Sequence, residues 1–457
     1  MATAKQQNSK TMNNGEGHTI YMLGIGGIGM SALARYYHSQ GHIVAGYDRT
    51  PSPLTRQLED EGMAIHYEDN PNLLPALIEF VVYTPAVPHN LKEFEALRER
   101  QLPIMKRAEA LGKITEGHFT IAVAGTHGKT TTTAMVAHIL NECGINTTAF
   151  IGGIANNFNS NLLLCKENDF VIVVEADEFD HSFLQLHPNI SIINSIDADH
   201  LDIYGDRQHL VQSFNDFANL TEGKVIVKED LAVQTDRGIR FGFGSGCDYR
   251  VEIIKSDQGV TDFILNGENQ KTEIKLPMAG KHNVMNATAA FIAARQIGIN
   301  AKTITEALAS FEGVKRRFDI RVKNAKYCYI DDYAHHPEEI RSCLTAVKEA
   351  FPERRLTLVF QPHLFSRTRD FMNDFAEVLA LADELILLDI YPARELPIEG
   401  ITSKALLDKV HLNDKRLCQK PELLDLIGSE KPTLLVTMGA GDIDRFVEPL
   451  ENMIKKW

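Results

Sequence analysis

The chain has 457 residues, of which 44% are hydrophobic and 24% are charged; this is typical of a globular protein with about three domains. Its 47 basic and 61 acidic residues give a net charge of -14, which argues against a general nucleic-acid binder or a membrane-surface binder. No apolar run approaches the ~18 residues that a membrane span requires. Anionic substrates remain compatible with this charge, because local basic residues can bind them.

The N-terminal residues and the cysteines both favour a cytoplasmic protein. Residues 1–17 are polar and lack the apolar segment of a signal peptide, so we expect a disordered tail there. The six cysteines are far apart and include no C-x-x-C pair, which favours isolated reduced thiols over a zinc site or a disulfide framework.

A first glycine-rich loop follows a short apolar stretch. Residues 19–23 predict a strand, Gly24-Ile-Gly-Gly-Ile-Gly29 predicts a loop that enters a helix, and a second strand over 43–47 ends at Asp48. This G-x-G-x-x-G spacing, with an acidic residue about 20 positions later, is typical of a diphosphate bound at a helix N-terminus. UDP satisfies the pattern as well as NAD does. Asp48 lies either near a ribose or another polar group, or at a simple strand-end turn.

A turn-rich segment and two helices complete the predicted first domain. A strand over 80–83 leads into a loop at 84–90, at the strand end where α/β proteins bind ligands. Helices are predicted next, over 91–100 and 107–113, followed by a short linker. We therefore expect the first domain to span residues 18–117.

A second glycine loop is the strongest chemical signal in the sequence. Residues 121–124 predict a buried strand, and Gly125-Thr-His-Gly128 predicts a turn before a helix that opens with Lys129 and Thr130. In such a loop, backbone N–H groups and the helix dipole bind phosphate, the lysine adds a charge, and the threonine hydroxyl reaches Mg²⁺. Val123 stands where the general P-loop pattern has glycine, so a plain glycine turn is the alternative. We predict a nucleoside triphosphate site.

Two predicted strands after this loop end in carboxylates. The strand over 170–174 runs into Glu175-Ala-Asp-Glu178, and the strand over 190–196 runs into Asp197-Ala-Asp-His-Leu-Asp202. Carboxylates at strand ends after a phosphate loop fit an Mg²⁺–phosphate site, with a solvated loop as the alternative. His200 is placed to hold a metal or a phosphate, although a lone histidine is more often structural.

The end of the central region supplies amides and arginines. Residues 224–267 are rich in strand and turn signals and predict an antiparallel elaboration. A following helix places Asn283 and Asn286 on one face, where both can contact one ligand such as an adenine edge. N-capping by one of these asparagines is the alternative. The adjacent Arg316-Arg317 pair suits a phosphate.

The last third predicts another α/β domain. Strands are expected over 327–330, 356–360, 384–389 and 433–438, each followed by a polar cluster. Parallel strands present such clusters at one edge of their sheet. The clusters are D-D-Y-A-H-H-P (331–337), Q-P-H-L-F-S-R-T-R (361–369), Y-P-A-R-E (391–395) and G-A-G-D (439–442).

Together these motifs resemble the Mur ligases, the ATP-dependent amide-forming enzymes of peptidoglycan precursor synthesis, over nearly the whole chain after the tail. Their order and spacing carry the resemblance. The motifs are G-I-G-G-I-G-M-S (24–31), A-G-T-H-G-K-T-T-T-T (124–133), E-A-D-E (175–178), D-A-D-H-L-D (197–202), G-K-H-N-V-M-N (280–286), R-R-F-D (316–319), D-D-Y-A-H-H-P (331–337), F-Q-P-H (360–363) and S-R-T-R (366–369).

The resemblance implies an α/β fold with the three-domain Mur ligase architecture. Its domains are a Rossmann-like UDP-sugar-binding domain (18–117), a central P-loop ATP-binding domain (118–319) and a C-terminal Rossmann-like domain that presents the amino acid (320–457). It implies a ligase that uses ATP and Mg²⁺ (or Mn²⁺) to join L-alanine to the carboxylate of UDP-N-acetylmuramate through an acyl phosphate. Attachment of a ready-made tripeptide is the alternative.

The resemblance also implies roles for individual residues. Lys129, Glu175, His200, Arg317 and His335 are the implied catalytic residues, and Thr130, Glu175 and His200 are the implied metal ligands. ATP is expected to contact Gly125, Thr126, His127, Gly128, Lys129, Thr130, Thr131, Asn283, Asn286, Arg317 and Asp332. The UDP-sugar is expected to contact Gly26, Gly27, Ile28, Ser31, Asp48, Thr84, Arg107 and His181, and the amino acid Tyr333, His335 and Arg367.

Two departures bear on the branch of the family. No lysine lies between His200 and Lys224, where later-acting Mur ligases carry a carbamylated lysine, and this favours the alanine-adding branch. Leu364 stands where many alanine ligases have an arginine, so the preference for alanine over glycine or serine stays open.

Rival functions remain at this point. A nicotinamide dehydrogenase would use the first glycine loop, and a regulatory protein would hydrolyse ATP without joining substrates. Under the leading interpretation the partners are ATP, UDP-N-acetylmuramate and L-alanine, with no nucleic acid, no stable membrane association, and a monomer or homodimer as the state of assembly.

Overall fold

The computed structural model describes residues 18–167, 169–197, 204, 206–393 and 395–457. Contacts within the chain divide it into two compact units, one ending at Ile114 and the other beginning at Thr115. The predicted tail and His200 lie outside the described residues. None of the helices in the described ranges is long and apolar enough to cross a lipid bilayer. All six cysteines are described, and none of them forms a disulfide.

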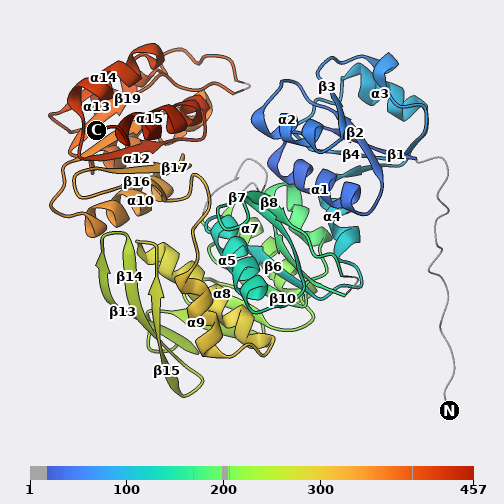
Figure 1. Cartoon of the computed structure of the whole chain (residues 1–457), viewed down its shortest axis with the longest axis horizontal. Helices are drawn as coiled ribbons and strands as arrows, with labels where there is room; N and C mark the ends of the chain where they lie inside the picture. Colours follow the sequence, from blue (N-terminus) through green and yellow to red (C-terminus); the bar gives the residue numbers. More distant parts are fainter. Residues whose placement is uncertain (1–17, 168, 198–203, 205, 394) are drawn as a thin grey trace. The chain divides into compact units, whose positions relative to one another are not determined.

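The first unit contains a parallel sheet with the strand order β3-β2-β1-β4-β5 (Figure 1, blue). Its order reverses between β1 and β4, and sheets of this kind bind ligands in the crevice beyond such a reversal. The predicted glycine loop starts directly after β1, and Thr84 directly follows β4. The strands are β1 (Thr19–Leu23), β2 (Ile43–Tyr47), β3 (Ala64–His66), β4 (Ile78–Tyr83) and β5 (Ile104–Lys106). The helices are α1 (Ile28–Ser39), α2 (Pro53–Asp60), η1 (Pro71–Leu73), α3 (Lys92–Glu99) and α4 (Arg107–Thr115), the last of which reaches the unit boundary.

The second unit contains two sheets, and the larger has the order β15-β14-β13-β12-β11-β10-β6-β9-β7-β8. Strands β6, β9 and β10 pair in parallel at its centre, so the segments that follow them meet at one edge. The strands are β6 (Thr120–Ala124), β7 (Thr147–Ala155), β8 (Ser160–Leu163), β9 (Val171–Glu175), β10 (Ile190–Ile193), β11 (Val225–Lys228), β12 (Gly238–Gly242), β13 (Tyr249–Asp257), β14 (Val260–Gly267) and β15 (Gln270–Leu276). The helices are α5 (Lys129–Glu142), η2 (Phe179–Gln185), α7 (Arg207–Leu220), α8 (Lys281–Gln296) and α9 (Ala301–Ala309).

The predicted antiparallel elaboration over 224–267 is wrong for its first half. Strands β11 and β12 continue the sheet in parallel, and only β13, β14 and β15 are antiparallel. Residues 225–227 are an unbroken buried run, as in a strand covered on both faces, whereas buried and exposed residues alternate at the start of β13. Figure 1 shows β13–β15 as a ribbon beside α9.

Helix α5 is buried on all sides because it lies between the sheet and two further helices. It contacts β6, β7 and β9 on one side and α8 and α9 on the other. Every residue from Thr130 to Leu140 is therefore buried, including four consecutive threonines. One hydrophobic cluster continues from this helix into the C-terminal part of the unit and includes Met135, Val284 and Leu344.

The smaller sheet of the second unit has the order β16-β17-β21-β18-β19-β20, with β16 antiparallel and the other strands parallel. The strands are β16 (Asp319–Lys323), β17 (Cys328–Asp332), β18 (Leu356–Phe360), β19 (Glu384–Leu387), β20 (Lys415–Leu417) and β21 (Leu434–Met438). The helices are α10 (Pro337–Ala350), α11 (Phe365–Asp370), α12 (Met372–Leu379), α13 (Ser403–Lys409), η3 (Lys420–Glu422), α14 (Leu423–Glu430), η4 (Asp442–Phe446) and α15 (Val447–Ile454).

Among the strand ends that differ from prediction, those of β10 and β17 affect the polar residues of the second unit. The strand expected over 190–196 ends at Ile193, so the residues after it join the phosphate loop instead. Strand β17 extends to Asp332, which places two carboxylates inside the sheet rather than in the loop after it. Asp331 tolerates this burial because the Thr437 hydroxyl donates a 2.7 Å hydrogen bond to it and Arg316 lies 3.3 Å away.

Candidate active site

The second glycine loop adopts a conformation that requires its glycines. Gly125 and Gly128 have φ of 137° and 79°, which side chains rarely tolerate. A Cβ on Gly125 would lie 2.9 Å from the Ser195 nitrogen, and one on Gly128 would lie 2.5 Å from Asn286 Oδ1. The His127 N–H donates to Ser195 Oγ (2.7 Å), so the loop is bound to the segment that follows β10. The loop thus opens α5 with its N–H groups at the helix N-terminus.

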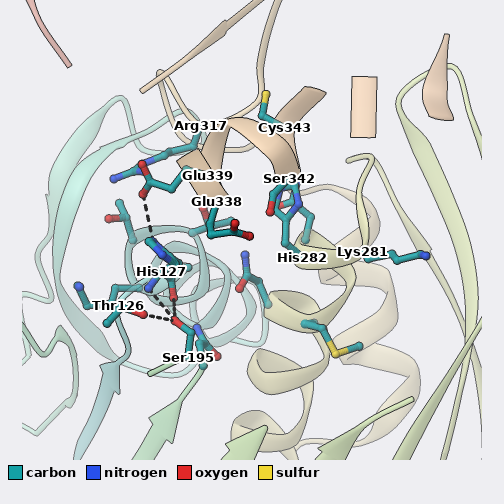
Figure 2. A pocket seen from close by; sticks show the side chains of 18 of the residues that line it. Thr126, His127, Ser195, Lys281, His282, Arg317, Glu338, Glu339, Ser342 and Cys343 are labelled. Carbon is teal, nitrogen blue, oxygen red and sulfur yellow. Dashed lines mark hydrogen bonds and ion pairs between the residues drawn. The ribbon is translucent and has the colours of Figure 1, made fainter. Parts of the chain in front are cut away.

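A pocket at this loop contains most of the residues predicted to contact ATP. The loop contributes Thr126, His127, Gly128, Lys129, Thr130 and Thr131. The remaining predicted residues that line the pocket come from outside the loop: Glu175, Asn283, Asn286, Arg317 and Asp332. Gly125 lies at the start of the loop, directly after β6. Figure 2 shows Glu339 in direct contact with His127, with Arg317 on the same side of the pocket as Glu339.

The two asparagines of α8 face the phosphate loop and do not cap the helix. Gly280 is the N-cap residue and offers no side-chain hydrogen bond, so the capping alternative is wrong. Asn283 Nδ2 donates to the Ala279 carbonyl (2.8 Å), and Asn286 Oδ1 lies against Gly128. Both side chains are buried and line the pocket, which is the arrangement the prediction of a shared ligand requires.

Glu175 and Thr130 are placed beside the Gly152–Gly153 pair of β7. The Gly152 N–H donates to Glu175 Oε2 (2.9 Å), and the space beside Gly153 is occupied by the Thr130 methyl group. A carboxylate and a hydroxyl next to a phosphate loop are suitable ligands for Mg²⁺, which commonly takes its remaining ligands from phosphates and water. Among the described residues, no group of three His, Cys, Asp or Glu side chains could hold a metal by itself. His200, the third predicted ligand, lies outside those residues.

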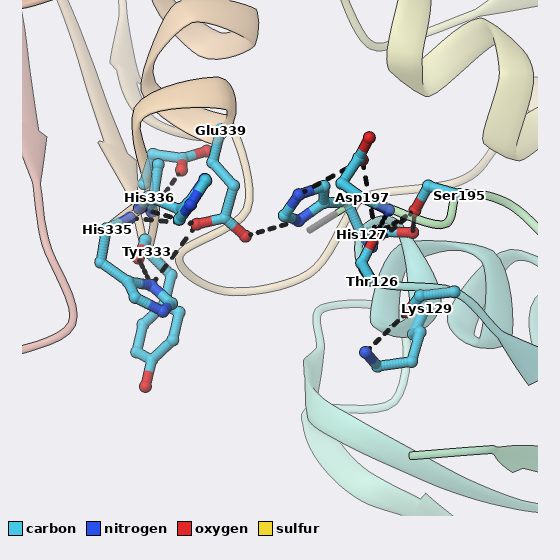
Figure 3. Close-up of polar contacts among 12 residues, drawn as sticks. Thr126, His127, Lys129, Ser195, Asp197, Tyr333, His335, His336 and Glu339 are labelled. Carbon is cyan, nitrogen blue, oxygen red and sulfur yellow. Dashed lines mark hydrogen bonds and ion pairs between the residues drawn. The ribbon is translucent and has the colours of Figure 1, made fainter. Parts of the chain in front are cut away.

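Glu339 connects the phosphate loop to the C-terminal sheet and was not predicted from the sequence. Its Oε1 lies 3.2 Å from His127 Nδ1, and its Oε2 accepts from the His335 N–H (3.1 Å) at the start of α10 (Figure 3). The pattern H-H-P-E-E, with Pro337 opening the helix and a glutamate in its first turn, is the signal that could have identified it.

The charges around this contact oppose the effect of burial. Burial alone lowers the pKa of His127, but the hydrogen bond and charge of Glu339, together with the charge of Asp197, raise it above its ordinary value. Burial would raise the pKa of Glu339, yet His335, His127 and Arg317 hold it well below its usual range. The contact is therefore an ion pair when His127 is protonated.

The predicted amino-acid residues gather around an aromatic cluster. The Tyr333 ring lies 5.0 Å from the Arg317 guanidinium and 5.2 Å from the His335 ring. Burial and the charge of Arg367 lower the pKa of His335, against the opposing charge of Glu339. Burial, His335 and Arg367 lower the pKa of His363 to about 4. Near neutral pH these imidazoles are uncharged.

The adjacent Arg316 and Arg317 have different surroundings. Arg316 pairs with Asp331 and donates to the Gly439 carbonyl (2.5 Å), so it connects β17 with the loop after β21. Arg317 lines the pocket next to Asp332. Asp332 accepts from the Phe318 N–H (2.6 Å) and the Ala334 N–H (2.7 Å), and so holds the turn that carries Arg317.

In the first unit, the residues predicted to contact the UDP-sugar surround the start of α1. The Gly26 N–H donates to Asp48 Oδ2 (2.8 Å), so this side chain binds the glycine loop. The Thr84 methyl group lies 2.6 Å from the position of a Cβ on Gly24. The Arg107 side chain lies 3.1 Å from the position of a Cβ on Gly29. The remaining predicted residues of this unit belong to the same turn and helix: Gly27, Ile28 and Ser31, the last of which donates to the Ile28 carbonyl.

His181, also predicted to contact the UDP-sugar, belongs to the second unit. Its Nδ1 lies 3.0 Å from Ser213 Oγ, and its ring is 4.8 Å from the ring of Tyr204. Its φ of 54° and that of Asp180 interrupt η2, so His181 sits at a left-handed kink after the carboxylate segment.

We predict that Gly152→Ala weakens divalent-cation binding. A Cβ at this position would lie 2.2 Å from Glu175 Oε2, so the carboxylate must move. The affinity for Mn²⁺ in the presence of a non-hydrolysable ATP analogue should fall by about 10–100-fold, as is typical when a neighbour of a metal ligand is altered. Mn²⁺ titration followed by electron paramagnetic resonance measures it. Gly246→Ala is the control, because a Cβ there meets no atom within 4 Å; equal Mn²⁺ affinity in the two variants would contradict the placement of Glu175.

We predict that Glu339→Gln lowers the pKa of His127, because burial then outweighs the remaining charges. In the wild-type protein the pKa of His127 is higher in the folded state than the unfolded-state pKa of 6.5. The ion pair therefore stabilises the fold fully at pH values below 6.5, and this stabilisation is lost as the pH rises through the folded-state pKa. Histidine C–H titration by NMR measures the change. Glu338→Gln, on the same helix, should leave the pKa of His127 in place. An unchanged His127 titration in Glu339→Gln would refute the ion pair.

Comparison with known proteins identifies similarity along most of the chain. The description "Mur ligase family, catalytic domain" matches residues 19–119, "Mur ligase middle domain" matches residues 123–294, and "Mur ligase, glutamate ligase domain" matches residues 316–441. A UDP-N-acetylmuramate–L-alanine ligase of Flavobacterium psychrophilum is 50% identical, covering 95% of this chain and 98% of that protein. The protein of the same name from Cytophaga hutchinsonii is 47% identical, covering 96% and 97%.

Solved structures agree with this assignment. The crystal structure of a UDP-N-acetylmuramate-alanine ligase from Thermotoga maritima superimposes with a TM-score of 0.83 at 32% identity, covering 95% of this chain and 99% of that one. A murein peptide ligase from Psychrobacter arcticus gives a TM-score of 0.72 at 26% identity, covering 96% and 99%. The three-domain α/β architecture expected from the sequence is confirmed. The chain belongs to the Mur ligase family.

Proposed function

We propose that this chain is an ATP-dependent ligase that joins L-alanine to the carboxylate of UDP-N-acetylmuramate in peptidoglycan precursor synthesis. The observation that carries the proposal is 42–50% identity, over nearly the whole chain, to curated UDP-N-acetylmuramate–L-alanine ligases. The phosphate loop at the pocket supports the use of ATP. A tripeptide-attaching ligase is the second candidate. It is less supported, because the murein peptide ligase has a lower TM-score and a lower identity to this chain than the alanine ligase structure has.

In this proposal the phosphate loop and Lys129 offset negative charge on the ATP phosphates as the γ-phosphoryl group passes to the muramate carboxylate. Arg317, in the turn that precedes β16, contacts the same phosphates. Thr130, Glu175 and His200 hold Mg²⁺, with Mn²⁺ as an alternative. The metal supplies Lewis-acid stabilisation of the phosphate charge. Asn283 and Asn286 contact adenine, while Asp332 contacts ATP through its ribose or phosphates.

The later step joins the amine to the activated carboxylate. Tyr333, His335 and Arg367 orient alanine and the acyl phosphate, and the amine attacks the acyl carbon so that phosphate leaves from a tetrahedral intermediate. The uncharged imidazole of His335 can accept a proton near this position. Gly26, Gly27, Ile28, Ser31, Asp48, Thr84, Arg107 and His181 bind the UDP-sugar.

The organisation of the protein is proposed on the same basis. Domain boundaries at 117/118 and 319/320 separate the UDP-sugar-binding, ATP-binding and amino-acid-presenting parts. The protein acts in the cytoplasm as a monomer or homodimer, without nucleic acid or a stable membrane association.

Phosphate release tests the reaction. With ATP, Mg²⁺ and UDP-N-acetylmuramate present, release should require L-alanine, and the product should be heavier by one alanine residue. Parallel reactions with glycine, serine and the tripeptide test the consequence of Leu364 and the second candidate. Release that depends only on the tripeptide would establish that candidate, and release indifferent to UDP-N-acetylmuramate would point to a simple ATPase.

We predict that Lys129→Ala lowers kcat/KM by at least about 10²–10³-fold, as does the loss of a single group that stabilises transition-state charge in other enzymes. Binding of the UDP-sugar, measured by calorimetry, should stay largely intact because Lys129 is not among the residues proposed to contact the UDP-sugar. Lys302→Ala is the control, since that side chain is 85% exposed. Unchanged turnover in Lys129→Ala would exclude the phosphate role.

A further inference from the structure

Lys129 is fully engaged by acceptors of the protein itself. Its Nζ donates to the Gly125 carbonyl (2.7 Å) and to both oxygens of Glu178 (2.8 and 3.0 Å). A lysine ammonium has three protons, so these contacts use every donor. To contact a phosphate, Lys129 must release at least one of these partners.

The backbone of Glu178 is anchored by a residue other than Lys129. Its carbonyl accepts a hydrogen bond from the Tyr204 hydroxyl (2.5 Å), and its side chain is 1% exposed. The left-handed residue Asp180 follows two positions later, at the kink of η2. The backbone that carries the carboxylate is therefore fixed beside the phosphate loop by contacts that do not involve Lys129.

Lys129 is the counter-ion of several carboxylates at the end of β9. Burial by itself lowers its pKa, but the charges of Glu178, Asp177 and Glu175 raise it above the ordinary value. Glu175 is also the proposed metal ligand. The carboxylate proposed to bind the metal and the carboxylate that binds Lys129 thus belong to one group of charges around this lysine.

We propose that Glu178 is a positioning residue that neutralises Lys129 until a divalent cation accompanies ATP, and so makes tight ATP binding depend on the metal. The inference rests on the proposed function, because it requires ATP at this loop. Metal-free ATP meets a lysine whose charge is already neutralised by Glu178. The neighbouring carboxylates then repel the ATP phosphates. When the cation offsets the carboxylate charge, Lys129 can exchange Glu178 for a phosphate oxygen. Since coupling is reciprocal, ATP must also tighten cation binding by the same factor.

A purely structural ion pair is the alternative. Buried ion pairs often add little net stability, because desolvation offsets their attraction, whereas the loss of one partner is costly. A structural role predicts that altering Glu178 lowers the stability of the protein but leaves the metal dependence of ATP affinity unchanged. The two roles therefore predict different ratios of the ATP dissociation constants measured without and with the metal.

The test measures the affinity for a non-hydrolysable ATP analogue by calorimetry, in EDTA and in Mg²⁺. We expect Glu178→Gln to tighten metal-free binding and to reduce the ratio of the two dissociation constants by at least about ten-fold, within the usual range of coupling between sites. Asp216→Asn is the control, because it removes an exposed carboxylate of the same unit that contacts Gln212 rather than Lys129, and it keeps an acceptor for Gln212 Nε2. Its ratio should stay within about three-fold of wild type.

The outcomes separate the possibilities. An unchanged ratio in Glu178→Gln, or an equal change in Asp216→Asn, would overturn the inference. A wild-type protein that binds the analogue in neither condition would instead overturn the proposed function. Neither outcome requires turnover to be measured.

A second measurement uses the wild-type protein and needs no variant to fold. Amine acylation of the metal-free protein, followed by mass spectrometry, compares Lys129 with Lys302, whose side chain is 85% exposed. The raised pKa and the engaged ammonium should slow acylation of Lys129 by at least about ten-fold relative to this internal standard. Equal rates would show that Lys129 is free and would overturn the inference.

Discussion

The phosphate loop between β6 and α5 is held by close contacts at its two left-handed glycines. Gly125 packs against the backbone at Ser195, and Gly128 packs against the Asn286 side chain. A Cβ at either position would collide with these atoms, so both positions require glycine. The contacts connect the loop with the end of β10 and with α8.

Parallel pairing explains why charged groups collect at this loop. Strands β6, β9 and β10 are neighbours, so the loop, the carboxylates after β9 and the residues after β10 leave the sheet at the same edge. Burial then makes each charge costly unless it is paired. The pairing of Lys129 with Glu178 and of His127 with Glu339 meets this requirement within the protein itself. Phosphate binding must therefore exchange existing partners rather than fill an uncharged cavity.

The C-terminal sheet adds groups whose tasks are set by their surroundings. Arg316 and Arg317 are neighbours with the same chemistry, but the first pairs with Asp331 inside the sheet and the second faces the pocket. Asp332 binds two backbone N–H groups and so determines how the turn presents Arg317. Polar residues after the strands thus divide into those that hold the site together and those available to a ligand.

The sequence by itself determined the nucleotide loops, the succession of strands and helices, and the family, because local periodicity and glycine spacing are properties of short segments. Strands β1, β2 and β18 agree with their predicted bounds residue for residue. The parallel pairing of β11 and β12 was decided by tertiary structure, since pairing direction depends on partners distant in the chain. Tertiary structure also decided that Glu178 binds Lys129 and that Glu339 reaches His127, which lies 212 positions away. Such contacts leave no spacing pattern in the sequence, because they form only when separate strand ends meet at one sheet edge.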